Sequence, residues 1–427
     1  MYKDQKPNKG YKVVREERSS KSFNDRPFKK DKNEFEKVER KDFKFNKDFK
    51  DYNDTNVHLS YKTSDFEKKK VDEQLKLKEQ MVKDLFQTDI LPIIPNPNPK
   101  GYRHKAVLSA VNIKMTKNFK IQLGLFEEGS KTVKPQLGHF LHHPKIDRIF
   151  ESIEKLLIKF KMRAYHDRSG EGIIKHVMIR KSYVFDEFMV VFSTQGNLFP
   201  NHKEFVRELI ALHPEIKTIV QNIHRKDSKF VLLEEEKVWY GPGYIRDQIG
   251  DLNFQISPRA FYQVNPAQMM NLYQKALEMA DITPKDTVID CYSGIGTITL
   301  LASKLAHHVY GFEINDSAVK DAINNKKIND VKNVTFALGD VEKLIEEFQE
   351  PVNLLIMDPT REGASLKFIQ SVLKLMPNKI LYISCDPRTQ IRDVKQLLKY
   401  YKINKVQPVD MFTYTAHVEN IVLLSLK

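Results

Sequence analysis

Two side chains towards the end of the sequence have the types needed for covalent catalysis. Cys385 follows the apolar stretch KILYIS and precedes Arg388, and a nearby cation lowers a thiol pKa and enriches the nucleophilic thiolate. Glu419 lies between Val418 and Ile421, so desolvation should raise the pKa of its carboxyl towards the range of a general base. We expect a thiolate that adds to an electron-poor carbon and a carboxylate that removes a proton. A strand-capping cysteine and a salt-bridged glutamate are the structural alternatives.

The remaining candidate reactive side chains are a second cysteine and a histidine. Cys291 is expected to be buried and inert, and His417 is either a second acid/base group or a packing residue. Two cysteines are too few for a disulfide framework, a thiolate-based zinc site or a cysteine-ligated iron–sulfur cluster. We therefore expect no metal site and no iron–sulfur cluster.

A glycine-containing turn, DCYSGIGTIT, is typical of a cofactor loop between a first strand and its helix. Gly294 and Gly296 permit a close approach of the backbone, but the third glycine of a dinucleotide fingerprint is missing. This favours a cofactor without phosphates, such as S-adenosylmethionine, over NAD. A tight turn that uses glycine only for its conformation is the alternative.

Acidic residues end the next predicted strands. Glu313 follows the glycine turn by about twenty residues, where a carboxylate can accept both ribose hydroxyls. Asp340, which could contact the adenine side, and Asp358 end the following two strands, and Cys385 ends the next. Ligands bind at the carboxyl ends of the strands in open α/β sheets, so these residues predict one site. Helix capping could explain any single acid.

The elements that position these residues alternate regularly after Pro258. Short β-rich runs and helices follow one another from PAQMMNLYQKALEMA to KILYISC, which predicts a doubly wound, mainly parallel, Rossmann-like α/β sheet. The last segment, VQPVDMFTYTAHVENIVLLSLK, reads as a terminal antiparallel pair of strands. We assign residues 251–427 to this domain.

The upstream sequence divides into two further parts. Residues 71–250 start with the helix VDEQLKLKEQMVKDLF and continue with mixed strands and helices, which predicts an α+β central domain that binds RNA. Its basic residues, Arg103, Lys105, Arg180 and Lys181, fit either RNA contact or surface solubility. Residues 1–70 are rich in Lys, Asp, Glu and Asn without periodicity, so we expect a disordered basic tail.

The overall charge and hydropathy fit a cytoplasmic protein with a polyanionic partner. The 427 residues carry a net charge of +14. The sequence begins without an apolar leader and has no apolar run long enough to cross a bilayer. We expect a cytoplasmic monomer without membrane contact.

Six ordered motifs resemble the RNA uracil-5-methyltransferase family, which includes bacterial enzymes that make 5-methyluridine in rRNA and tRNA. The motifs are FYQVN, DCYSGIGTITL, FEIN, MDPTREG, SCDPRT and DMFTYTAHVENIVLL, and the resemblance extends from about residue 71 onward. It implies a class I methyltransferase fold. It also implies that S-adenosylmethionine is bound by Gln263, Tyr292, Glu313 and Asp358, with Asp340 facing it and Gly294 allowing its approach.

The same resemblance assigns the nucleophile to Cys385 and the proton acceptor to Glu419. This fits the chemistry of uracil, whose C5 is too poor a nucleophile to take a methyl group directly. Thiolate addition at C6 pushes electron density onto C5, and removal of the C5 proton after methylation lets the thiolate leave. The target uracil must be unstacked before this can happen.

Departures from the family pattern bear mainly on the RNA target. Many rRNA-directed members carry an N-terminal oligonucleotide-binding domain and a four-cysteine iron–sulfur cluster, and neither is visible here. Thr360 and Asp386 replace common motif residues without removing a reacting group. SPRAFYQVNP and VDMF resemble ribosomal members, which favours 23S rRNA, with tRNA as the alternative.

Two other functions compete with uracil methylation. RNA cytosine-5-methyltransferases also use a thiolate, but they usually carry a second cysteine in the motif that corresponds to MDPTREG, where this sequence has none. A non-catalytic RNA-binding protein would not need both Cys385 and Glu419. We therefore expect an RNA (uracil-5-)-methyltransferase.

Overall fold

The structure describes a helix within the segment that the sequence analysis expected to be disordered. The computed structural model describes residues 63–115, 119–127, 130, 132–225, 228 and 230–427, so most of the expected disordered tail, 1–62, lies outside the described residues. Helix α1 (Thr63–Glu67) falls within the segment that we expected to be disordered. The reason is local burial: Phe66 is fully buried, and the Lys78 ammonium lies 5.7 Å from the centre of its ring.

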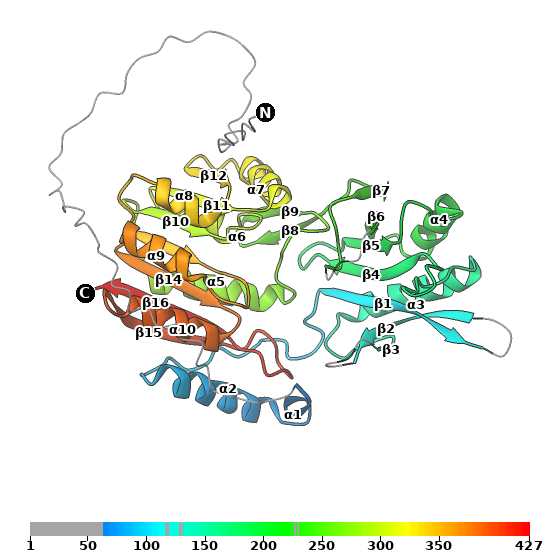
Figure 1. The fold of residues 1–427 in the computed structure, drawn as a ribbon, viewed down its shortest axis with the longest axis horizontal. Coiled ribbons are helices and arrows are strands. Elements are labelled where there is room, and N and C mark those ends of the chain that lie inside the picture. The colour runs from blue at the N-terminus through cyan, green and yellow to red at the C-terminus, as the bar shows by residue number, and fades with distance from the viewer. Residues whose placement is uncertain (1–62, 116–118, 128–129, 131, 226–227, 229) are drawn as a thin grey trace, which may run out of the picture.

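The C-terminal lobe is built on a seven-stranded sheet with the order β12-β11-β10-β13-β14-β16-β15 (Figure 1). Strands β10 to β14 are parallel, and β16 pairs antiparallel with both β14 and β15. This confirms the predicted doubly wound sheet with a terminal antiparallel pair. The strands are β10 (Thr287–Cys291), β11 (His308–Glu313), β12 (Val334–Leu338), β13 (Leu354–Met357), β14 (Lys379–Ser384), β15 (Tyr401–Val409) and β16 (Glu419–Leu426).

Helices cover both faces of this sheet, which explains why its strands are apolar runs. Successive strand residues point to opposite faces: Leu354 belongs to one core cluster and Leu355 to the other. One face is covered by α5 (Pro266–Ala280), α6 (Thr297–Ala302) and α7 (Asp316–Ile328). The other is covered by α8 (Val341–Glu347), α9 (Leu366–Leu375), α10 (Pro387–Leu397) and α2 (Val71–Phe86).

Helix α2 packs on the C-terminal lobe and not on the central lobe to which the sequence analysis assigned it. Its Val82, Leu85 and Phe86 are buried in the same cluster as Ile391 and Leu397 of α10. Figure 1 shows α2 beneath the last strands of the C-terminal sheet. The chain therefore crosses from this lobe to the central lobe after α2.

The central lobe contains a second seven-stranded sheet, with the order β3-β2-β1-β4-β5-β6-β7. Only the β5–β6 pair is parallel among its described strands. Its helices α3 (Pro144–Lys159) and α4 (His202–Leu212) cover one face. The strands are β1 (Lys105–Lys114), β2 (Phe119–Phe126), β3 (Val133–Pro135), β4 (Ile174–Lys181), β5 (Phe188–Thr194), β6 (Ile216–Ile223) and β7 (Glu236–Tyr240).

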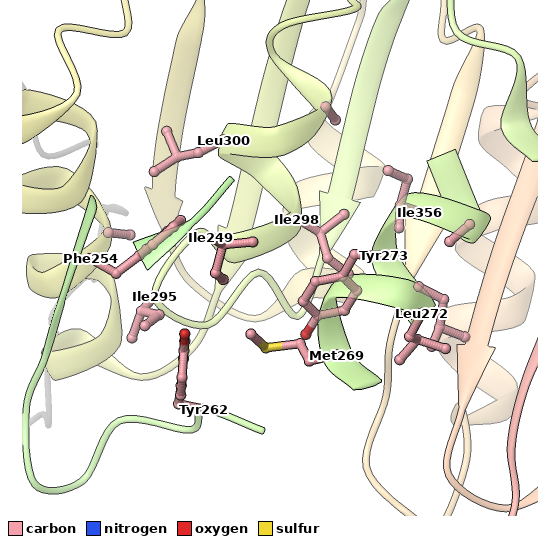
Figure 2. Packing of buried hydrophobic residues seen from close by; sticks show 14 of the residues in the cluster. Ile249, Phe254, Tyr262, Met269, Leu272, Tyr273, Ile295, Ile298, Leu300 and Ile356 are labelled. Carbon is pink, nitrogen blue, oxygen red and sulfur yellow. The ribbon is translucent and has the colours of Figure 1, made fainter. Parts of the chain in front are cut away.

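The two lobes share one hydrophobic core. Met178, Met189 and Val191 of the central sheet belong to the cluster that also contains residues of α5, α6 and α7. The hairpin of β8 (Ile245–Ile249) and β9 (Leu252–Ile256) packs into the same cluster, so the boundary expected at residue 250 falls in its turn. Figure 2 shows the neighbouring part of this core, with Tyr273 and Met269 of α5 beside Ile298 of α6. None of the described helices is long and apolar enough to span a membrane.

Candidate active site

The sheet topology gathers the predicted residues at one edge. Strands β10 and β13 are neighbours, but their chain connections lead to opposite sides of the sheet, and ligands bind at such a switch point. The loop after β10 carries Tyr292 and Gly294, and Asp358 follows β13 directly. Cys385 follows the next parallel strand, β14.

Antiparallel pairing brings Glu419 to the same edge. Ser384, the last residue of β14, pairs with Asn420 near the start of β16. The next residue along one strand is Cys385 and the preceding residue along the other is Glu419, so the two lie side by side. The sequence analysis placed these residues in one site, and the register shows how the fold achieves this.

Glu419 is buried among other carboxyls. Its side chain is 2% exposed, and burial, followed by the charge of Asp358, raises its pKa to about 8. Burial and the charge of Asp290 raise the pKa of Asp358 to about 7. Burial raises the pKa of Asp290 to about 7 as well, although Thr299 donates a hydrogen bond to Asp290 Oδ2 at 2.5 Å. The predicted desolvation of Glu419 is confirmed, and each of these carboxyls holds a proton more strongly than in water.

The environment of Cys385 contradicts the expectation of a thiol activated by Arg388. The half-buried thiol has its pKa raised to about 12 by burial and by the charges of Glu419 and Asp358. Arg388 does not counter this, because its Nε donates to Asp386 Oδ1 at 2.8 Å and its Nη2 donates to Asp386 Oδ2. Arg361 is the cation that lowers the pKa of Cys385. The free protein therefore holds this cysteine as a thiol.

His417 contacts Arg361, the arginine that also lowers the pKa of Cys385. Its Nδ1 lies 3.3 Å from Arg361 Nη2, and burial together with that charge lowers its pKa to about 4. The imidazole is neutral near pH 7, so it accepts a hydrogen bond from the guanidinium. This favours the packing role for His417 over an acid/base role.

The glycine loop leaves open space beside its backbone. Gly294 has φ +55°, and a Cβ built on it would meet nothing within 4 Å. By contrast, a Cβ on Gly296 would lie 2.6 Å from Phe336 Cζ, so that glycine is required for packing. The buried Ser293 hydroxyl has no hydrogen-bond partner among the described residues. An open backbone and an orphaned hydroxyl are the features expected where a small polar cofactor binds.

Glu313 and Asp340 organise the backbone around this loop. Glu313 Oε2 accepts from the Gly294 N–H at 3.0 Å, and its Oε1 accepts from the Asn315 N–H at 2.7 Å. Each oxygen retains a further lone pair for a ligand hydroxyl. Asp340 caps α8 by accepting from the Glu342 N–H at 3.0 Å, so the capping alternative holds for this residue.

Gln263 and Tyr292 are the remaining residues that the family resemblance assigned to the cofactor. Gln263 is 8% exposed, and its side chain lies close enough to the buried Tyr273 hydroxyl of α5 to lower the pKa of that hydroxyl, against the larger effect of burial. Tyr292 has φ +65°, an unfavourable conformation for a non-glycine residue that is often found at functional sites. Its ring packs against Phe368 with the ring centres 5.4 Å apart.

Three residues of the site had no role in the sequence analysis. Asp290 opens the glycine motif and Arg361 lies in MDPTREG, so motif position was the available signal for both. Tyr273 sits at an apolar helical position, and nothing in the sequence distinguishes it from a core residue. Cys291 is fully buried, as expected, and burial raises the pKa of its thiol. Among the described residues, no group of three or more His, Cys, Asp or Glu side chains could hold a metal ion.

Comparison with known proteins decides the family. Residues 201–427 match the family model described as tRNA (Uracil-5-)-methyltransferase. The chain belongs to this family. An RNA methyltransferase of Oceanobacillus iheyensis is 35% identical over 87% of this chain and 80% of its own length. One of Staphylococcus aureus is 33% identical over 87% of this chain and 81% of its own length.

A solved structure supports the fold of this RNA methyltransferase. It is the Pyrococcus abyssi tRNA (uracil-54, C5)-methyltransferase in complex with S-adenosyl-L-homocysteine, which matches with a TM-score of 0.68 and 24% identity over 83% of both chains. The predicted class I methyltransferase fold is confirmed. Family membership makes the protein an RNA methyltransferase that depends on S-adenosylmethionine.

Proposed function

We propose that this RNA methyltransferase methylates C5 of a specific uridine in 23S rRNA through a covalent bond to Cys385. The observation that carries the proposal is the pairing of Ser384 with Asn420, which sets Cys385 beside the buried Glu419. A nucleophile and a base must face the same ring, one at C6 and the other near C5, and this register provides two adjacent groups.

The residues of the glycine loop and its neighbours are proposed to hold the methyl donor. Glu313 would accept the ribose hydroxyls, Asp340 would lie towards the adenine, and Gly294 would allow the close approach of the ligand. Gln263, Tyr292 and Asp358 would complete the site. S-adenosylmethionine supplies an electrophilic methyl group when bound there.

The protein side chains perform the remaining steps. Cys385 releases its thiol proton to solvent and its Sγ forms a bond to C6 of the uracil, while the C5–C6 double-bond electrons move towards C5 and O4. After C5 carries the methyl group, Glu419 takes the C5 proton. The carboxyl must be ionised for this step, and because its pKa is about 8 only a part of the protein carries it in that form near pH 7. The electron pair of that C–H bond re-forms the C5–C6 double bond, and the Sγ–C6 bond breaks to release the thiolate. A carboxylate whose pKa is about 8 is a stronger base for this step than one in water.

The substrate is tested by identifying the methylated nucleoside. Unmodified 23S rRNA and tRNA transcripts are incubated separately with the full chain and labelled S-adenosylmethionine, then digested to nucleosides. We expect 5-methyluridine in 23S rRNA. 5-Methyluridine found in tRNA alone would identify tRNA, and not 23S rRNA, as the substrate. 5-Methylcytidine would contradict the proposal.

The division of labour is tested with variants that stop the reaction at different stages. Cys385→Ala should abolish both turnover and the covalent RNA adduct, whereas Glu419→Gln should accumulate the adduct because the C5 proton remains in place. Cys291→Ala is the matched control, since that buried thiol lies outside the proposed chemistry. Turnover by Cys385→Ala, or the lack of an adduct with Glu419→Gln, would contradict the assigned roles.

A further inference from the structure

The residues around Cys385 and Glu419, at the carboxyl ends of the C-terminal strands, are called the strand-end site below. A large cavity lies apart from this site, where the central lobe meets the C-terminal lobe. Its volume is about 850 Å³, within the range of small-molecule sites. It is lined by residues of the segments 98–104, 138–151, 181–183 and 265–267. Cys385, Glu419, Glu313 and Asp358 do not line it. The cavity is therefore a second candidate site.

Aromatic rings form much of its wall. The ring centre of His104 lies 5.4 Å from that of Tyr183 and 5.3 Å from that of His143. His139, also in the wall, stacks on Phe140 with the ring centres 4.9 Å apart. Flat π-faces of this kind bind nucleobases, because every base can stack on them.

Three histidines of the wall, His104, His139 and His143, are neutral near pH 7 and can form hydrogen bonds with a base. Burial lowers the pKa of His104 to about 3 and also lowers the pKa of His139 and His143. A neutral imidazole carries one donor and one acceptor. His104 is 8% exposed, and its Nδ1 has no hydrogen-bond partner among the described residues. An unsatisfied buried nitrogen is costly, and a ligand would remove that cost if a small shift of the imidazole ring brought this enclosed atom into contact with it.

The charges of the cavity fit one nucleotide and not a polyphosphate. Lys100, Arg148 and Lys181 contribute three cations, against the carboxylates of Asp147 and Glu151. Asp147 is already engaged, because its Oδ1 lies 2.8 Å from His142 Nδ1. Helix α3 also begins at the cavity and adds the positive end of its dipole. The small excess of positive charge at the cavity matches a single phosphate group.

The cavity is connected to the strand-end site through the backbone. Asn265 lines it two residues after Gln263, and the Asn265 side chain donates to the Met411 carbonyl at 2.9 Å. The Tyr102 hydroxyl, also in the wall, donates to the Thr413 carbonyl at 3.0 Å. The segment that these bonds hold, 410–418, leads directly to Glu419. The wall of the cavity and the segment that precedes Glu419 are therefore held together by direct hydrogen bonds.

We propose that this cavity binds a second unstacked nucleotide of the RNA substrate, near the methylated uridine along the strand. The base stacks on the rings around His104 and Tyr183 and pairs with imidazole nitrogens, while Lys100 and Lys181 hold its phosphate. The proposal rests on the proposed RNA substrate. It makes the cavity a selector of sequence context, since one uridine among many would be accepted only with the correct neighbour.

The first test compares two tyrosines of similar exposure. Tyr183 is 38% exposed and lines the cavity, and Tyr240 is 39% exposed and lies on β7, away from it. We expect Tyr183→Ala to weaken the affinity of the full chain for a short uridine-containing RNA strand by at least about fivefold, and to raise the KM for the RNA transcript more than it lowers kcat. Tyr240→Ala should change neither. Affinities of Tyr183→Ala and Lys181→Gln that stay within twofold of the unchanged protein would overturn the proposal.

The second test separates this proposal from the proposed reaction and from a free ligand. Ultraviolet crosslinking of the bound RNA strand, followed by peptide mapping, should attach nucleotides to the segments 139–143 and 181–183 even if no methyl group is transferred. Crosslinks confined to other segments would contradict the proposal. Uridine and adenosine 5′-monophosphate are titrated in parallel, and binding as tight as that of the strand would assign the cavity to a free nucleotide instead.

Discussion

Lys78 of helix α2 forms a fully buried ion pair with Asp410, with 2.6 Å between Nζ and Oδ1. The same ammonium donates to the Phe412 carbonyl at 3.0 Å, and Asp410 Oδ2 accepts from the Thr413 hydroxyl at 2.6 Å. Helix α2 thus holds the segment 410–418, which leads to Glu419. A buried pair contributes specific geometry more than net stability, and removal of one partner leaves an unpaired charge.

Lys78→Met should destabilise the fold by about 3–5 kcal/mol, because it leaves the Asp410 carboxylate buried without its partner. Urea unfolding measures this free energy. Lys76→Met, on an exposed position of the same helix, is the control and should change it by less than about 0.5 kcal/mol. The double variant Lys78→Met/Asp410→Asn should regain part of the loss, and an equal or larger loss would contradict the ion-pair argument.

The raised pKa of Glu419 predicts a pH-dependent change in stability. The folded protein binds this proton up to about pH 8, whereas the unfolded chain loses it near pH 4.3. Its stabilising contribution is therefore complete below pH 4 and is lost as the pH rises through 8. Glu419→Gln stays neutral, so it should be more stable than the unchanged protein at pH 9, by a few kcal/mol at most, and similar at pH 4.

Urea unfolding of Glu419→Gln at both pH values checks this expectation. Glu73→Gln, at an exposed position of α2, serves as the matched control and should show no such difference. A stability gap that is larger at pH 4 than at pH 9 would show that the carboxyl is ionised in the fold.

The thiol of Cys385 should react slowly with iodoacetamide, because its pKa of about 12 leaves little thiolate at neutral pH. In a Cys291→Ala background this is the single thiol of the chain. Arg361→Met removes the cation that lowers the pKa and should slow the reaction further. Asp386→Asn removes an acid that raises the pKa and frees Arg388, so it should speed the reaction. Alkylation rates between pH 7 and 10 measure both effects, and opposite signs would contradict the assigned charges.

The two glycines of the loop after β10, Gly294 and Gly296, should respond differently to alanine. Gly294→Ala meets open space, so it should cost only about 1–2 kcal/mol of stability from its positive φ while weakening S-adenosylmethionine binding clearly. Gly296→Ala collides with Phe336 and should lose more stability. Thermal unfolding and calorimetric titration with the cofactor separate the two outcomes. Unchanged cofactor affinity in Gly294→Ala would place the ligand elsewhere.

Much of the C-terminal lobe could be predicted because buried parallel strands are recognisable as short apolar runs between helices. The order of such strands also explains why Glu313, Asp358 and Cys385 meet at one edge. The apolar neighbours of Glu419 were enough to predict its raised pKa, since burial is the dominant cause.

The failures concern contacts between segments that are distant in the chain. The amphipathic pattern of α2 shows that it packs, but not that it packs on α10, and Lys78 resembles any surface lysine until Asp410 is placed beside it. Arg388 is close to Cys385 in sequence, yet its guanidinium is paired with the Asp386 carboxylate. Which guanidinium faces a thiol depends on side-chain geometry that local sequence does not specify.

The core shared by the two lobes has a consequence for how the substrate is accommodated. Met178 and Met189 of the central sheet are packed with residues of α5 to α7, and the Arg180 guanidinium donates to the carbonyls of Ser257 and Ala260 at 3.1 and 2.7 Å. A hinge between the lobes would have to break these contacts. We therefore expect the nucleic acid to deform more than the enzyme, so that much of the energetic cost of recognition depends on how readily each RNA loop opens.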